Sequence, residues 1–87
     1  MNQVKIFGKV KEIFKYRKGS VFGYLIRIAF VGFEHKFWLS LDNPLIDRLE
    51  EGHYYLFIGT LYKGKYGLSM DFTDATPISN DFLKKYF

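Results

Sequence analysis

The sequence predicts a small all-β domain, and three observations support this prediction. Of the 87 residues, 48% are hydrophobic and 21% are aromatic, a composition typical of a folded chain rather than a disordered one. Several segments alternate between apolar and polar residues with the period of two that β-strands show, and glycine-containing turn sequences separate them. The length suits one domain, and because the chain has no cysteine its core must stabilise it without disulfides.

The first predicted strand covers residues 2–18. Residues 4–10 place Val and Ile in one phase and Lys and Phe in the other, which is the strand period. Gly8 interrupts the strand, and the apolar phase becomes unclear at Ile13 and Phe14. We therefore expect a β-bulge or a sharp bend in this strand.

The next two strands form a meander with the first one. Residues 18–20 have a turn sequence, and residues 21–31 are a nearly continuous run of β-branched and aromatic side chains. A hairpin turn at residues 31–34 leads into a third strand over residues 35–41.

A short helix is predicted between the third and fourth strands. Asp42 and Asn43 offer side-chain acceptors for an N-cap, and Pro44 suits the first helical position. Apolar residues follow on one stripe, and Gly52 ends the helix after about two turns.

The rest of the chain is predicted to form a second hairpin and an extension. A fourth strand covers residues 53–62, a turn covers residues 63–65, and a fifth strand covers residues 66–72. Residues 73–77 are predicted as an irregular connector and residues 82–87 as one helical turn.

This β-β-β-α-β-β order is that of the five-stranded OB-fold barrel. The SH3-like barrel is the alternative, but it has no helix of this kind between its third and fourth strands. We predict an OB-fold nucleic-acid-binding domain over residues 1–74 and a C-terminal extension over residues 75–87.

The charge pattern indicates an anionic partner. The net charge is +4, and residues 1–40 hold eight Lys or Arg residues against two Glu. A positive face of this kind suits nucleic acid or an anionic membrane surface. No apolar run is long enough for a membrane span, and the start has no signal-peptide pattern, so we expect a cytoplasmic protein without a membrane partner.

Three segments resemble a known family. EEGHYYLFIGTL (residues 50–61) resembles the fourth-strand region of bacterial and phage single-stranded-DNA-binding proteins. In that family a glycine opens the strand, alternate residues enter the barrel, and a second glycine precedes a further core leucine; the matching residues are Gly52, Tyr55, Phe57, Gly59 and Leu61. HKFWLSLDNPLIDRL (residues 35–49) is similar to the third strand and helix of that family. GTLYKGKYGLSMDF (residues 59–72) looks like the hairpin of small phage helix-destabilising proteins. The chain ends in FLKKYF instead of the acidic tail of the bacterial proteins, so the resemblance does not extend to their docking of protein partners.

Single-strand binding needs a cationic groove and aromatic faces on which unpaired bases stack. In the third strand, if Phe37, Leu39 and Leu41 face the core, then Lys36 and Trp38 face outward; the alternative is that Trp38 belongs to the core.

The hairpins and the second strand add further candidates. Rings and cations alternate over residues 14–18, although a charged hairpin edge that resists aggregation looks similar. Tyr62 and Tyr66 flank the two lysines of the 63–65 turn, although an ordinary solubilised hairpin is the alternative there. Arg27 interrupts an apolar strand, so it either emerges on the binding face or pairs with Glu12 or Glu34. The predicted DNA-binding residues are Phe14, Tyr16, Arg17, Lys18, Phe22, Tyr24, Arg27, Lys36, Trp38, Tyr62, Lys63, Lys65 and Tyr66.

The residue pattern of the fourth strand predicts that another segment or subunit covers its outer face. With Tyr55, Phe57 and Leu61 inward, the outward residues include Leu56 and Ile58, and this face is too apolar for water alone. A partner subunit or the C-terminal segment would cover it, so we expect a homodimer or a larger homo-oligomer.

The motifs favour binding over catalysis. The sequence has neither metal-ligand spacing nor a nucleotide-binding loop, so we expect no catalytic residues, metal or cofactor. Together with the resemblance, this predicts a largely sequence-independent single-stranded-DNA-binding protein that protects unpaired DNA during replication, of phage or mobile-element origin. RNA binding and a protein-interaction module remain the alternatives.

Overall fold

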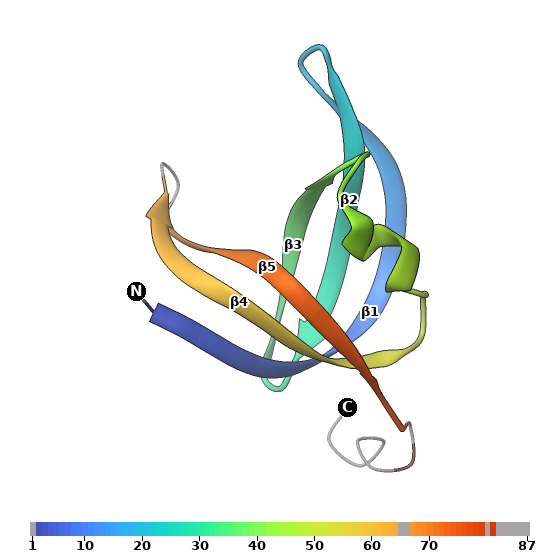
Figure 1. Ribbon diagram of the computed structural model, residues 1–87, viewed down its shortest axis with the longest axis vertical. Coiled ribbons are helices and arrows are strands. Elements are labelled where there is room, and N and C mark those ends of the chain that lie inside the picture. Colours follow the sequence, from blue (N-terminus) through green and yellow to red (C-terminus); the bar gives the residue numbers. More distant parts are fainter. Residues whose placement is uncertain (1, 65–66, 80, 82–87) are drawn as a thin grey trace.

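The computed structural model describes residues 2–64, 67–79 and 81, and it consists of one antiparallel five-stranded sheet (Figure 1). The strand order across the sheet is β3-β2-β1-β4-β5. The elements are β1 (Asn2–Lys18), β2 (Val21–Phe30), β3 (Phe33–Ser40), the 3-10 helix η1 (Pro44–Arg48), β4 (Tyr54–Gly64) and β5 (Gly67–Ile78). The predicted all-β class with five antiparallel strands is confirmed.

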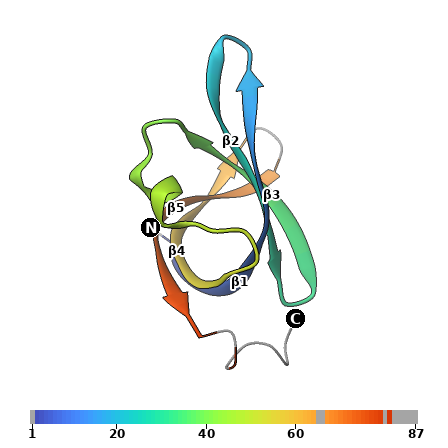
Figure 2. The ribbon, with the colours of Figure 1, turned by 90° about the vertical axis from the view of Figure 1, so that its right-hand side faces the viewer.

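The sheet curls until its two edge strands approach each other (Figures 1 and 2). The ring of Phe37 in β3 lies 4.4 Å from the ring of Phe72 in β5, centroid to centroid. Within the described residues, however, no backbone pairing joins β3 to β5. The sheet therefore does not close into the barrel that the sequence predicted. An apolar cavity of about 230 Å³ opens at this seam, lined partly by Ile6, Phe33 and Met70.

The core lies inside the curl. Its most buried large side chains are Tyr55, Phe57, Ile26, Ile28 and Val10. The aromatic rings of the core meet mainly edge to face, and this arrangement adds to the stabilisation from apolar burial. The predicted inward orientation of Phe37 and Leu39 is confirmed, whereas Leu41 is 50% exposed in the turn after β3, contrary to the prediction.

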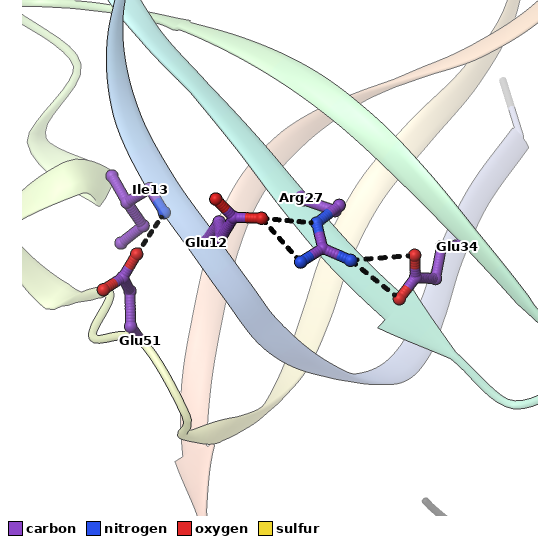
Figure 3. A network of polar contacts seen from close by, with 5 residues as sticks. All are labelled: Glu12, Ile13, Arg27, Glu34 and Glu51. Carbon is purple, nitrogen blue, oxygen red and sulfur yellow. Dashed lines mark hydrogen bonds and ion pairs between the residues drawn. The ribbon is translucent and has the colours of Figure 1, made fainter.

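The expected bulge in β1 lies between Val10 and Glu12, where the register with β2 shifts by one residue. The loop before β4 holds this bend in place. The backbone N–H of Val10 donates to the carbonyl of His53 at 3.0 Å, and its carbonyl accepts from Gly52 N–H at 2.7 Å. The N–H of Ile13 donates to the Glu51 carboxylate at 2.8 Å (Figure 3). Ile13 packs against the core after this shift.

The connection between β3 and β4 is a single 3-10 helix of five residues, not the two-turn helix predicted to end at Gly52. The predicted start is confirmed, because the Asn43 side chain accepts from the N–H of Leu45 at 3.0 Å. The early end has a tertiary cause. The Tyr55 hydroxyl donates to the carbonyl of Arg48 and accepts from the N–H of Glu50. These two backbone groups therefore bond a side chain of β4 instead of forming the hydrogen bonds of a longer helix.

β5 is longer than predicted. Residues 73–77 continue the strand as far as Ile78, and Thr73 is the extra residue of a bulge opposite Ile58 and Gly59. Pro77 pairs opposite Tyr55, which an edge strand tolerates because one side of its backbone needs no ladder partner. The predicted helical turn at residues 82–87 lies outside the described residues. Among the described residues no helix is long and apolar enough to cross a membrane.

Candidate nucleic-acid interface

The outer face of β1, β2 and β3 brings several predicted site residues together. Strand pairing places Phe14 opposite Leu25 and Leu25 opposite Trp38. The next outward row places Tyr16 opposite Gly23. We call these residues the ring face: Phe14, Tyr16, Gly23, Leu25 and Trp38. Because Phe37 and Leu39 are buried in the core, the alternation of the strand turns Trp38 outward.

Because Gly23 has no side chain, the indole of Trp38 can lie against its backbone. A Cβ atom at Gly23 would lie 2.5 Å from a ring carbon of Trp38 and 2.5 Å from the carbonyl oxygen of Leu39. The ring of Tyr16 meets the indole edge to face, with centroids 6.1 Å apart and planes at 78°. Trp38 is half-buried and Tyr16 is 47% exposed, so both rings keep accessible surface.

A hollow of about 340 Å³ adjoins the edge of Trp38 at the open seam between β3 and β5. Its lining combines rings with polar groups, including Ser40, Asn43, Asp71 and Phe72. The Ser40 hydroxyl donates to the Asp42 carboxylate at 2.7 Å. This bond links the end of β3, which lines the hollow, to the turn that follows it. The ring face therefore continues into a concave surface.

The β1–β2 hairpin presents its rings on two faces. Arg17 pairs opposite Phe22 and Lys15 pairs opposite Tyr24, in the same phase as the core residue Ile26. The Arg17 guanidinium lies 5.7 Å from the Phe22 ring centroid, and its Nε donates to the carbonyl of Gly19. Arg17, Phe22 and Tyr24 thus lie on the face opposite Phe14 and Tyr16. Lys18 ends β1, and its side chain lies outside what the structure describes.

The β4–β5 hairpin carries the remaining candidates. Tyr62 and Lys63 are exposed near the end of β4, whereas Lys65 and Tyr66 lie outside the described residues. Figure 1 shows the β1–β2 hairpin extending beyond the rest of the sheet at the top of the view, with the adjoining ends of β4 and β5 at the upper left.

Arg27 lies on the outer face, where it forms the ion pairs of the alternative prediction (Figure 3). Its Nη2 lies 2.6 Å from a Glu12 oxygen and its Nη1 lies 3.1 Å from a Glu34 oxygen. Hydrogen bonds to Glu12 and then Glu34 raise the pKa of Arg27. Lys36 pairs opposite Arg27 in the sheet and is exposed; within the described part of the chain it makes no ion pair.

Gly23 and Leu25 are members of the ring face that were not among the predicted site residues. An isolated glycine within a strand signals close approach of another group, and in this sequence that signal was available at Gly23. Leu25 gave no such signal, because an apolar residue within an apolar strand is as typical of the core as of an outer face.

Among the described residues, no three His, Asp or Glu side chains gather in a way that could hold a metal ion. Comparison of the chain with protein-family models, with curated proteins and with solved structures finds no match.

Proposed function

We propose that this chain is an OB-fold protein that binds single-stranded DNA largely independently of sequence. The strand order β3-β2-β1-β4-β5, the helical connection between β3 and β4, and the curl that brings β3 toward β5 support this fold assignment. OB-folds are partly open five-stranded barrels that bind oligonucleotides on strands 2 and 3 and on the loops between strands 1 and 2 and between strands 4 and 5.

The observation that carries the proposal is the ring face. Tyr16 and Trp38 contact each other on the outer surface, Phe14 belongs to the adjacent row, and the exposed Lys36 lies next to Trp38 in β3. Stacking of a base on such a ring contributes about 1–3 kcal/mol and tolerates any base, because every base has a π-face. Lysines add phosphate contacts, which carry no sequence information.

The proposed mechanism is mass action. A protein that binds only the unpaired strand shifts the melting equilibrium of a duplex toward separated strands. While bound, it shields the strand and holds it ready for replication. In this proposal the protein acts in the cytoplasm of a host cell, as a phage or mobile-element product, and as a homodimer or larger assembly.

The test is a titration of a labelled dT oligonucleotide, followed by fluorescence anisotropy at salt concentrations from about 50 to about 200 mM. We expect saturable binding that weakens with salt and little binding to duplex DNA. Lys36→Gln should lower the slope of log K against log salt by about 0.7, because one phosphate contact is lost. Lys5→Gln, an exposed lysine at the far end of β1, is the matched control and should leave the slope nearly unchanged.

Two outcomes of this titration contradict the proposal. Equal binding of duplex and single strands would exclude a role for the rings. Tighter binding of an RNA oligonucleotide would indicate that the same surface binds RNA instead of DNA.

A protein-interaction module is the second candidate, and a separate surface favours it. Val31 and Phe33, at the turn between β2 and β3, are 60% and 54% exposed. Exposed apolar residues of this kind often mark protein contacts. Absence of any salt-dependent oligonucleotide binding would favour this candidate.

A further inference from the structure

We infer that Glu12 and Glu34 keep Arg27 from contacting phosphate and so set the limit of the nucleic-acid surface on the outer face. This inference rests on the proposed function and deepens it. It concerns the row of outward residues next to the ring face, where Glu12 pairs opposite Arg27 and Arg27 pairs opposite Lys36.

The contacts of Arg27 with the two carboxylates leave at most two of its five N–H groups for a ligand. Its Nε and Nη2 donate to one oxygen of Glu12, at 3.1 and 2.6 Å. Its Nη1 donates to both oxygens of Glu34, at 3.2 and 3.1 Å (Figure 3). All three guanidinium nitrogens are therefore engaged, and the two carboxylates lie on opposite sides of the group.

Charge and exposure reinforce this arrangement. Two carboxylates against one guanidinium give these three side chains a net charge of about −1 at neutral pH, and the exposed Lys36 opposite Arg27 carries one positive charge beside them. The side chains of Glu12 and Glu34 are 51% and 47% exposed, whereas that of Arg27 is 29% exposed. A phosphate that approaches from solvent thus meets the carboxylates more readily than the cation, and like charges repel it.

The same contacts contribute little to folding, which makes the inference testable. Ion pairs between exposed side chains stabilise proteins only slightly, and Gln keeps the size of Glu. Glu34→Gln and the double variant Glu12→Gln/Glu34→Gln should therefore fold like the wild type, as circular dichroism would show.

The experiment measures affinity for the labelled dT oligonucleotide by anisotropy over a range of salt. We expect the double variant to bind several-fold more tightly, with a slope of log K against log salt that is steeper by about 0.7, because Arg27 becomes one additional phosphate contact. Asp47→Asn is the charge-matched control for the single variant Glu34→Gln, because each removes one negative charge; Asp47 is exposed on η1 and belongs to neither the cluster nor the ring face. It should change the affinity and slope much less.

Arg27→Gln completes a double-mutant cycle. In this background, removal of the two carboxylates should give little of the gain seen with Arg27 present. A gain of equal size in both backgrounds would overturn the inference, as would equal gains from Asp47→Asn and Glu34→Gln, or no gain at all. If the wild type itself does not bind the oligonucleotide, the proposed function and this inference both fall, whereas a binding wild type with unresponsive variants removes the inference alone.

Discussion

At the scale of single residues, the ring face depends on Gly23. This position has no space for a Cβ atom, because the Trp38 indole and the Leu39 carbonyl oxygen occupy it. The backbone oxygen cannot move without disturbing the pairing of β2 with β3, and the indole can only tilt away. The glycine therefore fixes where the candidate stacking ring lies.

Gly23→Ala should destabilise the fold by about 1–3 kcal/mol, the usual cost of forcing an atom into a packed site. It should also shift the Trp38 emission to longer wavelength, because the displaced indole meets more water. Urea unfolding and emission spectra would test both effects.

Gly8→Ala is the matched control for this prediction. A Cβ there would lie 2.8 Å from a methyl group of Ile28, inside the core and among residues other than Trp38. It should reduce stability without changing the emission of the folded state. An unchanged emission maximum in Gly23→Ala would contradict the packing of the Trp38 indole against Gly23.

Tyr55 is the second residue with a large structural role. Its ring is buried in the core, and its hydroxyl bridges Arg48 and Glu50 at the end of η1. Burial raises the pKa of this hydroxyl, the hydrogen bond from the Glu50 backbone lowers it, and the Glu50 charge raises it, with a net upward shift. The folded state thus favours the neutral phenol.

The sign of the resulting pH dependence follows from linkage. A pKa that is higher in the folded state stabilises the fold fully below the unfolded-state value of about 10, and this stabilisation is lost as the pH rises through the raised pKa. We predict that Tyr55→Phe costs about 1 kcal/mol at neutral pH, for the lost hydrogen bonds. Its unfolding free energy should also fall less than that of the wild type above about pH 10. Identical pH profiles in urea unfolding would contradict this role of the hydroxyl.

At the scale of elements, the bend of β1 depends on the loop that precedes β4. Gly52 donates to the carbonyl of Val10 and has a φ of +84°, a conformation that L-residues rarely adopt. The Glu51 carboxylate and the His53 carbonyl accept from the N–H groups of Ile13 and Val10, which lie on the two sides of the bulge. The loop and the bulge therefore stabilise each other.

We predict that Gly52→Ala destabilises the protein by about 1–2 kcal/mol, because its Cβ opposes the left-handed conformation. Gly52→Asn is the conservative comparison and should cost less, since Asn enters this region more readily. Thermal unfolding of the two variants would measure the difference, and equal stabilities for the wild type and Gly52→Ala would refute the prediction.

The elements also show what the sequence could predict and where it failed. Residues 2–18 and 21–30 were predictable as strands because their apolar pattern is strong. The second half of β5 was missed, because Thr73, Asp74 and Pro77 lack an alternating pattern and its edge position depends on the completed sheet. The length of η1 was overestimated, since Tyr55 takes the backbone groups that a longer helix would need.

At the scale of the whole molecule, the candidate site was predictable by composition and only partly by position. The outward position of Trp38 followed from strand alternation, but the register that brings it beside Tyr16 depends on the bulge at Lys11. Phe14, Tyr16, Phe22 and Tyr24 were all predicted as DNA-binding residues. The fold separates Phe14 and Tyr16 from Phe22 and Tyr24, because residues in alternate phase face opposite sides of a strand.

The central claim is that an unpaired strand lies on the ring face at Trp38, and quenching of Trp38 fluorescence tests it most directly, because this is the only tryptophan in the chain. On titration with dT oligonucleotides, we predict saturable quenching with the same midpoint as the anisotropy titration, weaker at high salt and nearly absent with duplex DNA. Oligonucleotide binding that leaves the Trp38 emission unchanged would place the strand elsewhere and contradict the claim.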